Sequence, residues 1–337
     1  MTKEQSMADA NTVKVTCLGY VFVPAAQDII RSIAPQGFEL RFAEHPAFEH
    51  EAWLADSDFV FIVSPMTEAM MKKAPKLRLI QKWGIGVDKI DLQAAEALGI
   101  PVAITAGANA ASVSEHTMMH MLALSRRLTM ADRAMREGRW VVGDIRPQAR
   151  QLLKKTVGIL GFGNIGRAVA QRLQGFGVRV LYYDIKGPFN AVAGPLNATF
   201  VDMDTLLSES DILTIHIPGG GNNRYLFNAA TFAKMKPGAA LINAARGDIV
   251  EETALIEVLE SGHLSGAGLD VYESEPRGET PLAKFDNVVL TPHSAGSVMD
   301  NVAPMAQHGL ENMLRVLRGE PIPEADVVVK PTNPRQV

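Results

Sequence analysis

Three closely spaced glycines, Gly161, Gly163 and Gly166, constrain the fold of this chain more than any other feature of its sequence. They follow an apolar run that ends at Leu160 and open an amphipathic run that begins at Asn164. A buried strand, a glycine turn and a helix in this order form the first half of a β–α–β unit. Such units build parallel sheets that helices cover on both faces. The sequence therefore predicts an α/β fold around this turn.

Strand-like apolar runs alternate with helical patterns in two series along the chain. A long helical stretch over 110–137 separates the two series, and shorter helices are predicted over 24–33 and 67–74. We expect an amphipathic helix over 300–318 to return to the first domain, because no strand is predicted after it. The first series of predicted strands is Val13–Leu18, Glu39–Ala43, Phe59–Val63, Leu77–Lys82 and Val102–Ile104, and the second is Val157–Leu160, Val180–Tyr183, Ile212–Ile217, Ala240–Asn243, Gly266–Asp270 and Val288–Leu290.

The composition limits the classes of partner. The net charge is −4 and no run of Lys or Arg occurs, which argues against a nucleic-acid footprint. No apolar run reaches the roughly 18 residues that a membrane helix needs, and the polar first dozen residues lack the apolar core of a signal peptide. Cys17 is the only cysteine, which excludes an internal disulfide and fits a reducing compartment. We therefore expect a cytoplasmic protein that binds neither nucleic acid nor membrane.

The glycine spacing G-x-G-x-x-G, in its strand–turn–helix context, predicts a dinucleotide site. Gly161 permits the tight turn, Gly163 lets the backbone approach a pyrophosphate, and Gly166 lets helix and strand pack closely. The helix N-terminus at Asn164 and Ile165 supplies free N–H groups and a partial positive charge to the phosphates.

Asp184 ends the next predicted strand, "RVLYYD", 184 − 161 = 23 residues after the first glycine. A ribose-binding acid is expected about 20 residues after that glycine. A carboxylate there accepts hydrogen bonds from the ribose hydroxyls and repels a 2′-phosphate, which favours NAD over NADP. Lys186 leaves NADP open, because a cation two residues further on can tolerate a phosphate.

Together, these features predict two doubly wound parallel-sheet domains, each long enough to bury a core. The first is expected to be discontinuous, over 1–107 and 298–337. The second, over 108–297, contains the glycine turn. We expect a Rossmann NAD-binding domain inserted in a flavodoxin-like substrate domain.

His293, in "LTPHSAG", is the best candidate for an acid or base. It follows a buried strand at the carboxyl edge of the second sheet, where open α/β sheets bind ligands. Arg246 and Asp270 end other strands of that sheet, so the three residues are expected to share one edge. Glu273 or Glu275, in "VYESEP", could hold one tautomer of His293 and keep a proton available for a carbonyl oxygen. The same carboxylates, or Asp270, could instead pair with Arg246.

The other histidines carry weaker signals. His116 and His120 have the i, i+4 spacing of a zinc pair, but "HTMMH" lacks the Glu of H-E-x-x-H, and packing or subunit contact is favoured. His216 ends the run "ILTIHI" and either contacts a cofactor or is a satisfied strand-end histidine. The remaining four are expected to be solvated: His45, His50, His263 and His308.

The runs "GIGVDKIDL", "GFGNIG", "MKPGAALINAARGDIVEETAL", "GAGLDVYESEP" and "LTPHSAG" together resemble the NAD-dependent D-2-hydroxyacid dehydrogenase family over nearly the whole chain. That family includes phosphoglycerate, glycerate and D-lactate dehydrogenases. The resemblance implies a homodimer formed through the NAD-binding domain, for which the helical stretch after Ala110 is a candidate element.

The resemblance also implies residue roles. Arg246 would bind the substrate carboxylate, and His293 would be the acid in reduction and the base in oxidation. Glu275 would pair with His293, and Asp270 would orient the nicotinamide carboxamide. The backbone of Ile85 and Gly86 would hold the substrate carboxylate, and further cofactor contacts are expected at His216, Pro218, Ala244, Arg246, His293 and Gly296.

Some positions depart from the family pattern. Ser64 stands where phosphoglycerate enzymes carry an Arg for the phosphate, which argues for an unphosphorylated substrate. Trp83 replaces a smaller residue and either shapes the pocket or packs into the domain wall. The run "HIPGGGNN" replaces a "P-L-T" turn, giving either a pliable loop near the cofactor or an exposed turn. Substrate selectivity is expected to rest on Ser64, Met66, Thr67 and Trp83.

The sequence thus predicts an NAD-dependent oxidoreductase that interconverts a small 2-keto acid, such as glyoxylate or hydroxypyruvate, and a D-2-hydroxy acid. A phosphoglycerate dehydrogenase-like enzyme is one alternative. Formate dehydrogenase is a second, which Glu275 opposes because those enzymes pair a Gln with the histidine. A third is a non-catalytic NAD-sensing protein, similar to corepressors of the C-terminal-binding type.

Overall fold

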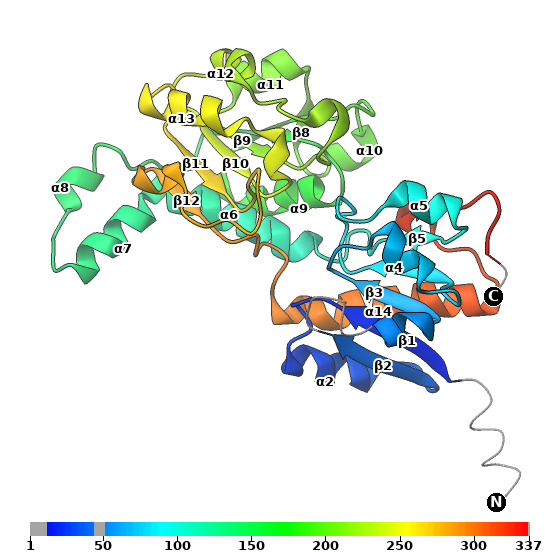
Figure 1. Ribbon diagram of the computed structural model, residues 1–337. Coiled ribbons are helices and arrows are strands. Elements are labelled where there is room, and N and C mark those ends of the chain that lie inside the picture. Colours follow the sequence, from blue (N-terminus) through cyan, green and yellow to red (C-terminus); the bar gives the residue numbers. More distant parts are fainter. Residues whose placement is uncertain (1–11, 44–50, 336–337) are drawn as a thin grey trace, which may run out of the picture. The chain divides into compact units, whose positions relative to one another are not determined.

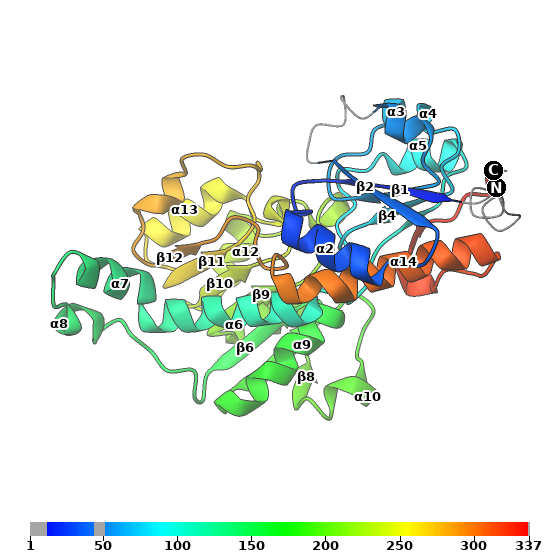
Figure 2. The same ribbon diagram turned by 90° about the horizontal axis from the view of Figure 1, so that it is seen from below.

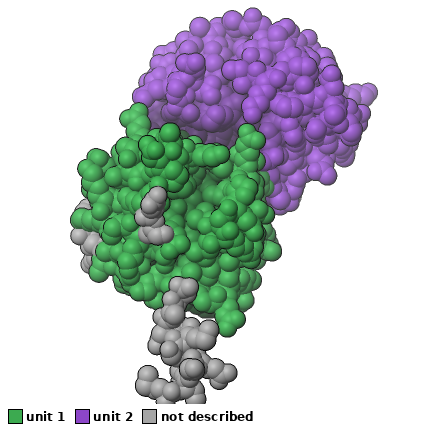
Figure 3. All heavy atoms as spheres, turned by 90° about the vertical axis from the view of Figure 1, so that its right-hand side faces the viewer, with its two compact units in different colours: residues 1–109, 298–337 green, residues 110–297 purple. Residues whose placement is uncertain are grey.

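The computed structural model describes residues 12–43 and 51–335. The chain divides into two compact units, coloured separately in Figure 3. Unit 1 comprises residues 1–109 and 298–337, and unit 2 comprises residues 110–297. Two chain crossings therefore join the units, one after residue 109 and one before residue 298.

Unit 1 contains a six-stranded sheet in the order β13-β5-β4-β3-β1-β2. Its first five strands in sequence are parallel, and β13 joins the edge strand β5 antiparallel. The strands are β1 (Val13–Leu18), β2 (Phe38–Ala43), β3 (Phe59–Ile62), β4 (Leu79–Lys82), β5 (Val102–Ala103) and β13 (Val327–Val329).

Helices cover both faces of the unit 1 sheet. Side chains of α2 and α14 pack together with Val15, Phe59 and Phe61 in one buried cluster. Side chains of α3, α4 and α5 share a second cluster with Val60 and Ile80 on the other face. Strand neighbours alternate between the faces, which is why the central strand β3 is apolar and buried at every position. The helices are α2 (Pro24–Ile33), α3 (Glu51–Ala55), α4 (Glu68–Lys72), α5 (Leu92–Ala97) and α14 (Val302–Arg318).

Unit 2 contains a seven-stranded parallel sheet in the order β12-β11-β10-β9-β6-β7-β8. The strand order reverses between β6 and β9, and open α/β sheets bind ligands at the carboxyl ends of strands at such a point. The strands are β6 (Thr156–Leu160), β7 (Arg179–Tyr183), β8 (Ala198–Phe200), β9 (Ile212–Ile215), β10 (Ala240–Asn243), β11 (Gly266–Leu269) and β12 (Val288–Leu290).

Helices α6, α9 and α10 cover one face of this sheet, and α11, α12 and α13 cover the other. Helices α7 and α8 instead form an arm that extends from the end of α6 (Figures 1 and 2). The helices are α6 (Ala110–Arg126), α7 (Leu128–Arg136), α8 (Val142–Ile145), α9 (Asn164–Leu173), α10 (Asn190–Ala193), α11 (Met203–Glu209), α12 (Ala229–Lys234) and α13 (Glu252–Glu260).

The predicted fold class of two doubly wound α/β domains is confirmed, with some differences in its elements. The expectation that no strand follows the late helix is wrong, because β13 follows α14. Strand β8 was also missed, and both strands have only three residues. The helix predicted over 110–137 breaks at Arg127, whose φ of +53° is left-handed, and resumes as α7.

Among the residues that the structure describes, no helix is long and apolar enough to cross a membrane. Two of the histidines expected to be solvated instead have partners. His263 Nε2 lies 2.9 Å from the carbonyl oxygen of Phe232, and His308 Nε2 lies 2.7 Å from a carboxylate oxygen of buried Asp326. His45 and His50 lie outside the described residues.

Candidate active site

The glycine turn after β6 has the geometry that its sequence predicts. Gly161 has a φ of +93°, and a Cβ there would lie 2.6 Å from the carbonyl oxygen of His216. A Cβ on Gly166 would collide with the carbonyl oxygen of Gly161, so helix α9 approaches the turn more closely than any side chain allows. A Cβ on Gly163 would meet no heavy atom within 4 Å. The amides of Asn164 and Ile165 follow at the start of α9, so the turn fits a pyrophosphate.

Asp184 lies directly after β7, beside this turn. One carboxylate oxygen accepts a hydrogen bond of 2.8 Å from the Phe162 amide, and the other accepts one of 2.9 Å from the Lys186 amide. The carboxylate is therefore fixed between the glycine turn and the chain that leaves β7. Each oxygen keeps a second lone pair for an outside donor such as a ribose hydroxyl.

His216 follows β9, next to the glycine turn in the sheet order. Its Nε2 lies 2.9 Å from Thr214 Oγ1, while its Nδ1 is buried with no hydrogen-bond partner among the described residues. Burial lowers its pKa from 6.5 to about 3, so the ring is neutral near pH 7. The sequence left open whether His216 contacts a cofactor or is a strand-end histidine with all its hydrogen bonds made. In the described part of the chain only Nε2 has a partner, and Nδ1 has none.

Arg246 lies in a tight turn after β10. The Asn243 side chain holds this turn from both sides, accepting from the Ala245 amide at 3.0 Å and donating to the Arg246 carbonyl at 2.8 Å. A Cβ on Gly247 would overlap the carbonyl of Tyr272, so only glycine lets the two loops pack this closely. The half-buried Arg246 is thereby placed against the loop that follows β11.

His293 and Glu275 form a dyad at the same edge of the sheet. The distance from His293 Nδ1 to Glu275 Oε2 is 2.6 Å, and Glu275 Oε1 accepts from the Tyr272 amide at 3.0 Å. His293 has a left-handed φ of +52°, and its amide donates to the Asp270 carbonyl at 2.7 Å. About half of the His293 side chain is exposed, so the imidazole is available to a ligand.

Asp270 is fully buried between these residues, at the end of β11. Its carboxylate accepts from Thr291 Oγ1 at 2.6 Å and from the amides of Ser294 and Ala295, each at 2.9 Å. Burial by itself raises the pKa of this carboxyl. The hydrogen bonds from His116 and Thr291 and from the two amides outweigh burial and hold the pKa below its ordinary value. Asp270 thus anchors the loop that carries His293.

Because β10, β11 and β12 are neighbours in register, Arg246, Asp270 and His293 share one edge, as the sequence predicts. Each of the three carboxylates that were considered as partners of Arg246 accepts hydrogen bonds from other groups as well, Asp270 as described above. Glu273 accepts from the Glu252 amide at 2.8 Å, and Glu275 pairs with His293. The edge therefore presents a cation and an acid–base dyad on either side of a buried carboxylate.

His116 is the site residue that sequence reasoning missed. Packing or subunit contact was favoured for it, yet its Nε2 lies 2.9 Å from Thr291 Oγ1 and 3.3 Å from Asp270 Oδ1. His120 Nε2 also lies 3.2 Å from the same hydroxyl. Helix α6 comes this close because β11 carries glycine at 268, where a Cβ would lie 3.0 Å from His120. The small residues in "GAGLD" are the signal that could have indicated this approach.

The zinc interpretation of this pair has no support in the structure. Within residues 12–43 and 51–335, no group of three or more His, Cys, Asp or Glu side chains could hold a metal ion.

The substrate residues expected in the first domain all lie in unit 1. Trp83 packs against Phe22 and Phe61, with ring centroids 5.2 and 5.0 Å away, so it contributes to the domain wall. Ser64 Oγ is buried and has no hydrogen-bond partner in the described part of the chain. Thr67 Oγ1 caps α4 by accepting from the Met70 amide at 3.4 Å. The other three residues follow β3 or β4 and differ in exposure. Met66 is buried, Gly86 is half-buried and Ile85 is 37% exposed.

The remaining expected cofactor residues line the loops of the same edge in unit 2. Pro218 follows β9, and its carbonyl accepts from the Asn223 side chain at 2.9 Å. Ala244 is half-buried between β10 and Arg246, and Gly296 follows the two residues whose amides bind Asp270.

Known proteins share both the sequence and the architecture of this chain. Residues 118–295 match the family model described as D-isomer specific 2-hydroxyacid dehydrogenase, NAD binding domain. The chain belongs to this family. It is therefore an NAD-dependent oxidoreductase that interconverts a 2-keto acid and a 2-hydroxy acid.

Individual relatives agree with this assignment. The chain is similar to a glyoxylate reductase of Thermofilum pendens, with 38% identity over 79% of each chain. It is also similar to a hydroxypyruvate reductase of Thermotoga maritima, with 40% identity over 70% of this chain and 76% of the relative. Among solved structures, the NAD complex of a formate dehydrogenase from Staphylococcus aureus superposes with a TM-score of 0.81. It is 30% identical and covers 94% of this chain and 99% of its own.

Proposed function

We propose that this member of the family reduces a small, unphosphorylated 2-keto acid of the glyoxylate or hydroxypyruvate class to the D-2-hydroxy acid. The observation that carries the proposal is the single sheet edge on which Arg246 and the His293–Glu275 dyad flank Asp270. A cation for a carboxylate and a proton donor for a carbonyl oxygen are the two groups that this reduction needs. Two relatives named glyoxylate reductase and hydroxypyruvate reductase support the substrate class.

In this proposal, Arg246 binds the substrate carboxylate and polarises the keto oxygen. Its planar guanidinium offers parallel N–H donors that match two oxygens at once, which a lysine ammonium does not. The turn held by Asn243 and Gly247 limits the movement of the backbone beneath it. Substrate binding therefore needs little reordering of the site.

His293 supplies the proton in the proposed reduction. The Glu275 carboxylate can only accept, so Nδ1 of His293 carries a hydrogen and Nε2 is the atom that exchanges a proton with substrate. A nicotinamide bound at this edge would supply the hydride for the keto carbon. As that bond forms, His293 donates its Nε2 proton to the carbonyl oxygen, and in the oxidation the same nitrogen takes the proton back.

Asp270 is proposed to orient the nicotinamide carboxamide, and the glycine turn with Asp184 to hold the rest of the cofactor. The buried, ionised Asp270 carboxylate is a fixed acceptor for an amide. His216 stays a proposed cofactor residue because it directly follows β9, the strand next to β6 and its glycine turn. Pro218, Ala244 and Gly296 stay proposed cofactor residues on the loops of this edge.

Ser64 argues for an unphosphorylated substrate, because its uncharged hydroxyl cannot balance a phosphate as an arginine does. Assignment of Thr67, Trp83, Ile85 and Gly86 to substrate binding stays part of the proposal. For Trp83 the role is that of a rigid wall behind the selectivity residues, given its packing on Phe22 and Phe61.

A kinetic panel tests this function. Purified protein is mixed with NADH or NADPH and with glyoxylate, hydroxypyruvate, phosphohydroxypyruvate and larger 2-keto acids, and absorbance at the nicotinamide band is followed. The proposal expects the highest kcat/KM with NADH and a small unphosphorylated acid. A preference for the phosphorylated acid would favour the phosphoglycerate-like alternative. Tight NADH binding without turnover of any acid would favour the NAD-sensing alternative.

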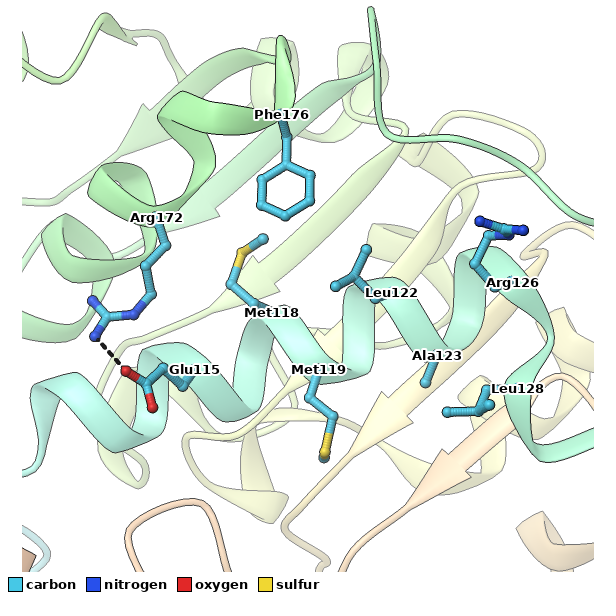
Figure 4. Close-up of a pocket in the computed structure, with 9 residues that line it drawn as sticks. All are labelled: Glu115, Met118, Met119, Leu122, Ala123, Arg126, Leu128, Arg172 and Phe176. Carbon is cyan, nitrogen blue, oxygen red and sulfur yellow. Dashed lines mark hydrogen bonds and ion pairs between the residues drawn. The ribbon is translucent and has the colours of Figure 1, made fainter. Parts of the chain in front are cut away.

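We further propose a homodimer formed through unit 2. Residues of α6, of α9 and of the turn directly after α9 line an open groove of about 690 Å³, with apolar walls of Met118, Met119, Leu122 and Phe176 (Figure 4). A salt bridge of 3.0 Å between Arg172 and Glu115 borders it. The arm after α6 carries further exposed apolar side chains, which are Leu128 at 54%, Met135 at 54%, Trp140 at 80% and Val142 at 51%.

An apolar groove next to an apolar arm suits a second copy of the chain, since a two-fold axis places each arm on the other copy's groove. Light scattering during gel filtration tests this. Trp140→Glu and Met119→Glu are expected to shift the dimer to monomer. Ile33→Glu, at an apolar position of α2 in unit 1 that is 38% exposed and so comparable to Met119 at 43%, is the matched control and is expected to leave it dimeric. A wild-type monomer would contradict the proposal. The cytoplasmic location stays a prediction from the sequence.

A further inference from the structure

A run of three glycines, Gly219 to Gly221, lies in the loop after β9, at the sheet edge that carries Arg246. The sequence left two interpretations open, a pliable loop near the cofactor or an exposed turn. The loop is neither simply exposed nor unrestrained, because Gly219 contacts Arg246 and Gly220 is hydrogen-bonded to the carboxylate of Asp248.

Gly219 packs directly on the aliphatic stem of Arg246. A Cβ at position 219 would lie 2.8 Å from Cγ and 2.9 Å from Cβ of Arg246, and 2.5 Å from Oδ1 of Asp248. Real Cβ atoms do not approach other atoms this closely, so the loop reaches Arg246 only because residue 219 is glycine. Gly219 is therefore needed for close packing against Arg246, and not only for a flexible backbone.

Asp248 holds the loop in this position. Its Oδ2 accepts a hydrogen bond of 2.8 Å from the Gly220 amide, and its own carbonyl accepts one of 2.8 Å from the Tyr225 amide. Gly220 has a φ of +70° and Gly221 a φ of +52°, so the loop could adopt many conformations if it were not tied down. A charged acceptor makes a stronger bond to an amide than a neutral one. Asp248 thus restricts a segment that its glycines would otherwise leave free.

The other end of the same segment is fixed on the cofactor turn. The carbonyl of His216 lies against Gly161, where no Cβ would fit. The short loop from His216 to Gly219 therefore spans from the dinucleotide turn to Arg246, with a tight contact at each end.

We propose that Asp248 is a positioning residue that holds the loop of residues 218–221 against the stem of Arg246 and so fixes the guanidinium for the substrate. This inference rests on the proposed role of Arg246 as the carboxylate-binding residue. Asp248 touches neither substrate nor cofactor in this scheme. Its removal frees the loop and lets the Arg246 side chain sample other rotamers, while the β10 turn itself remains held by Asn243.

Three variants test the proposal in steady-state kinetics with NADH and the best 2-keto acid. Asp248→Ala is expected to lower kcat/KM for the keto acid about tenfold or more, since small misplacements of a binding group have effects of this size. NADH affinity, measured by fluorescence titration, is expected to change less than about twofold. Asp248→Asn keeps an acceptor for the Gly220 amide and is expected to recover most of the loss. Gly219→Ala is expected to lower kcat/KM for the keto acid as Asp248→Ala does, because the added Cβ would push the loop away from Arg246.

The control is Asp204→Ala, which removes an exposed carboxylate of α11 that pairs with Lys234 at 2.8 Å. It is expected to behave as the wild type. Wild-type kcat/KM in Asp248→Ala would overturn the proposal. So would an equal loss of NADH and keto-acid binding, because that result indicates a general structural role.

Oxalate binding in the presence of NADH separates this inference from the proposed function. Oxalate carries the carboxylate that Arg246 is proposed to hold, and its binding needs no turnover. Weaker oxalate binding by Asp248→Ala than by the wild type supports the inference even if the panel of acids shows no activity. Equal affinities contradict the inference alone, whereas absence of oxalate binding and of turnover in the wild type contradicts the proposed function.

Discussion

His293 Nδ1 and Glu275 Oε2 lie 2.6 Å apart, and each of the two residues also has its own hydrogen bond to the backbone of the β11 loop or strand end. Glu275 also accepts from the Tyr272 amide, and the His293 amide donates to the Asp270 carbonyl. The imidazole orientation is thus fixed from two loops at once. This is the arrangement expected of an acid–base histidine whose outward nitrogen must meet a substrate.

Replacement of either member of the dyad is expected to slow the reaction, to different degrees. His293→Ala removes the proton donor and is expected to lower kcat by about 10²- to 10⁴-fold. Glu275→Gln keeps an acceptor for Nδ1 but removes the charge, so a smaller loss of about tenfold is expected. Stopped-flow measurement of NADH oxidation checks both. Retention of most activity by His293→Ala near pH 7 would rule out its role as the acid.

Arg246→Lys is expected to weaken binding and turnover of the keto acid and to leave NADH binding nearly unchanged. The ammonium keeps the charge but loses the parallel donors of the guanidinium, so KM for the keto acid rises and kcat falls. The combined loss in kcat/KM is expected to be about 10²-fold. The dissociation constant of NADH, from fluorescence, is expected to remain within about twofold. Unchanged turnover would show that Arg246 does not contact the substrate.

His116 is expected to act through Asp270 and not on the substrate. His116→Leu removes the donor at Thr291 and Asp270, so the carboxylate and the loop that carries His293 become less well fixed. A drop in kcat of about tenfold is expected, with partial recovery in His116→Gln, which can donate again. His263→Gln, at a histidine bonded to the Phe232 carbonyl, serves as the control. Equal activities of His116→Leu and His263→Gln would contradict this role.

His120 makes the stability of unit 2 depend on pH. Burial, with a smaller effect from His116, lowers its pKa from 6.5 to about 4. The unfolded chain therefore binds a proton below pH 6.5 that the folded chain does not bind until about pH 4. Stability from this residue is complete above pH 6.5 and falls as the pH drops, by about 2 kcal/mol at pH 5.

Chemical denaturation at several pH values checks this dependence. Between pH 7 and pH 5, His120→Gln is expected to lose less stability than the wild type, because its amide does not titrate. Parallel pH profiles for the two proteins would contradict this prediction, because they would show that the pKa of His120 is the same in the folded and unfolded chains.

Asp184 is expected to set the cofactor preference. Asp184→Ser removes the charge that repels a 2′-phosphate, and Lys186 then lies close enough in sequence to attract one. The ratio of kcat/KM with NADPH to that with NADH is expected to rise at least tenfold. Addition of Lys186→Ala to this variant is expected to reverse part of the gain. An unchanged ratio would show that other residues select the cofactor.

Local patterns predicted most of the architecture. The apolar strands and the glycine turn can be recognised in the sequence because strand burial and turn geometry depend on residues that are close together in the chain. Strand β8 was missed because none of its three residues is buried, so it gives no apolar run of the kind that β12, equally short, provides. Strand β13 exists only because the edge of the unit 1 sheet, β5, offers unpaired backbone to it.

The sequence by itself determined the two α/β units, the dinucleotide turn, and the strand ends that carry Arg246, Asp270 and His293. The tertiary structure decided which side chains support them. His116 meets Thr291 across 175 positions, and Gly219 meets Arg246 across the sheet from β9 to β10. Such contacts depend on strand order and on how closely a helix or loop can approach, which glycines at positions 219 and 268 permit. Those distances arise from packing of the whole unit, so no local run of residues encodes them.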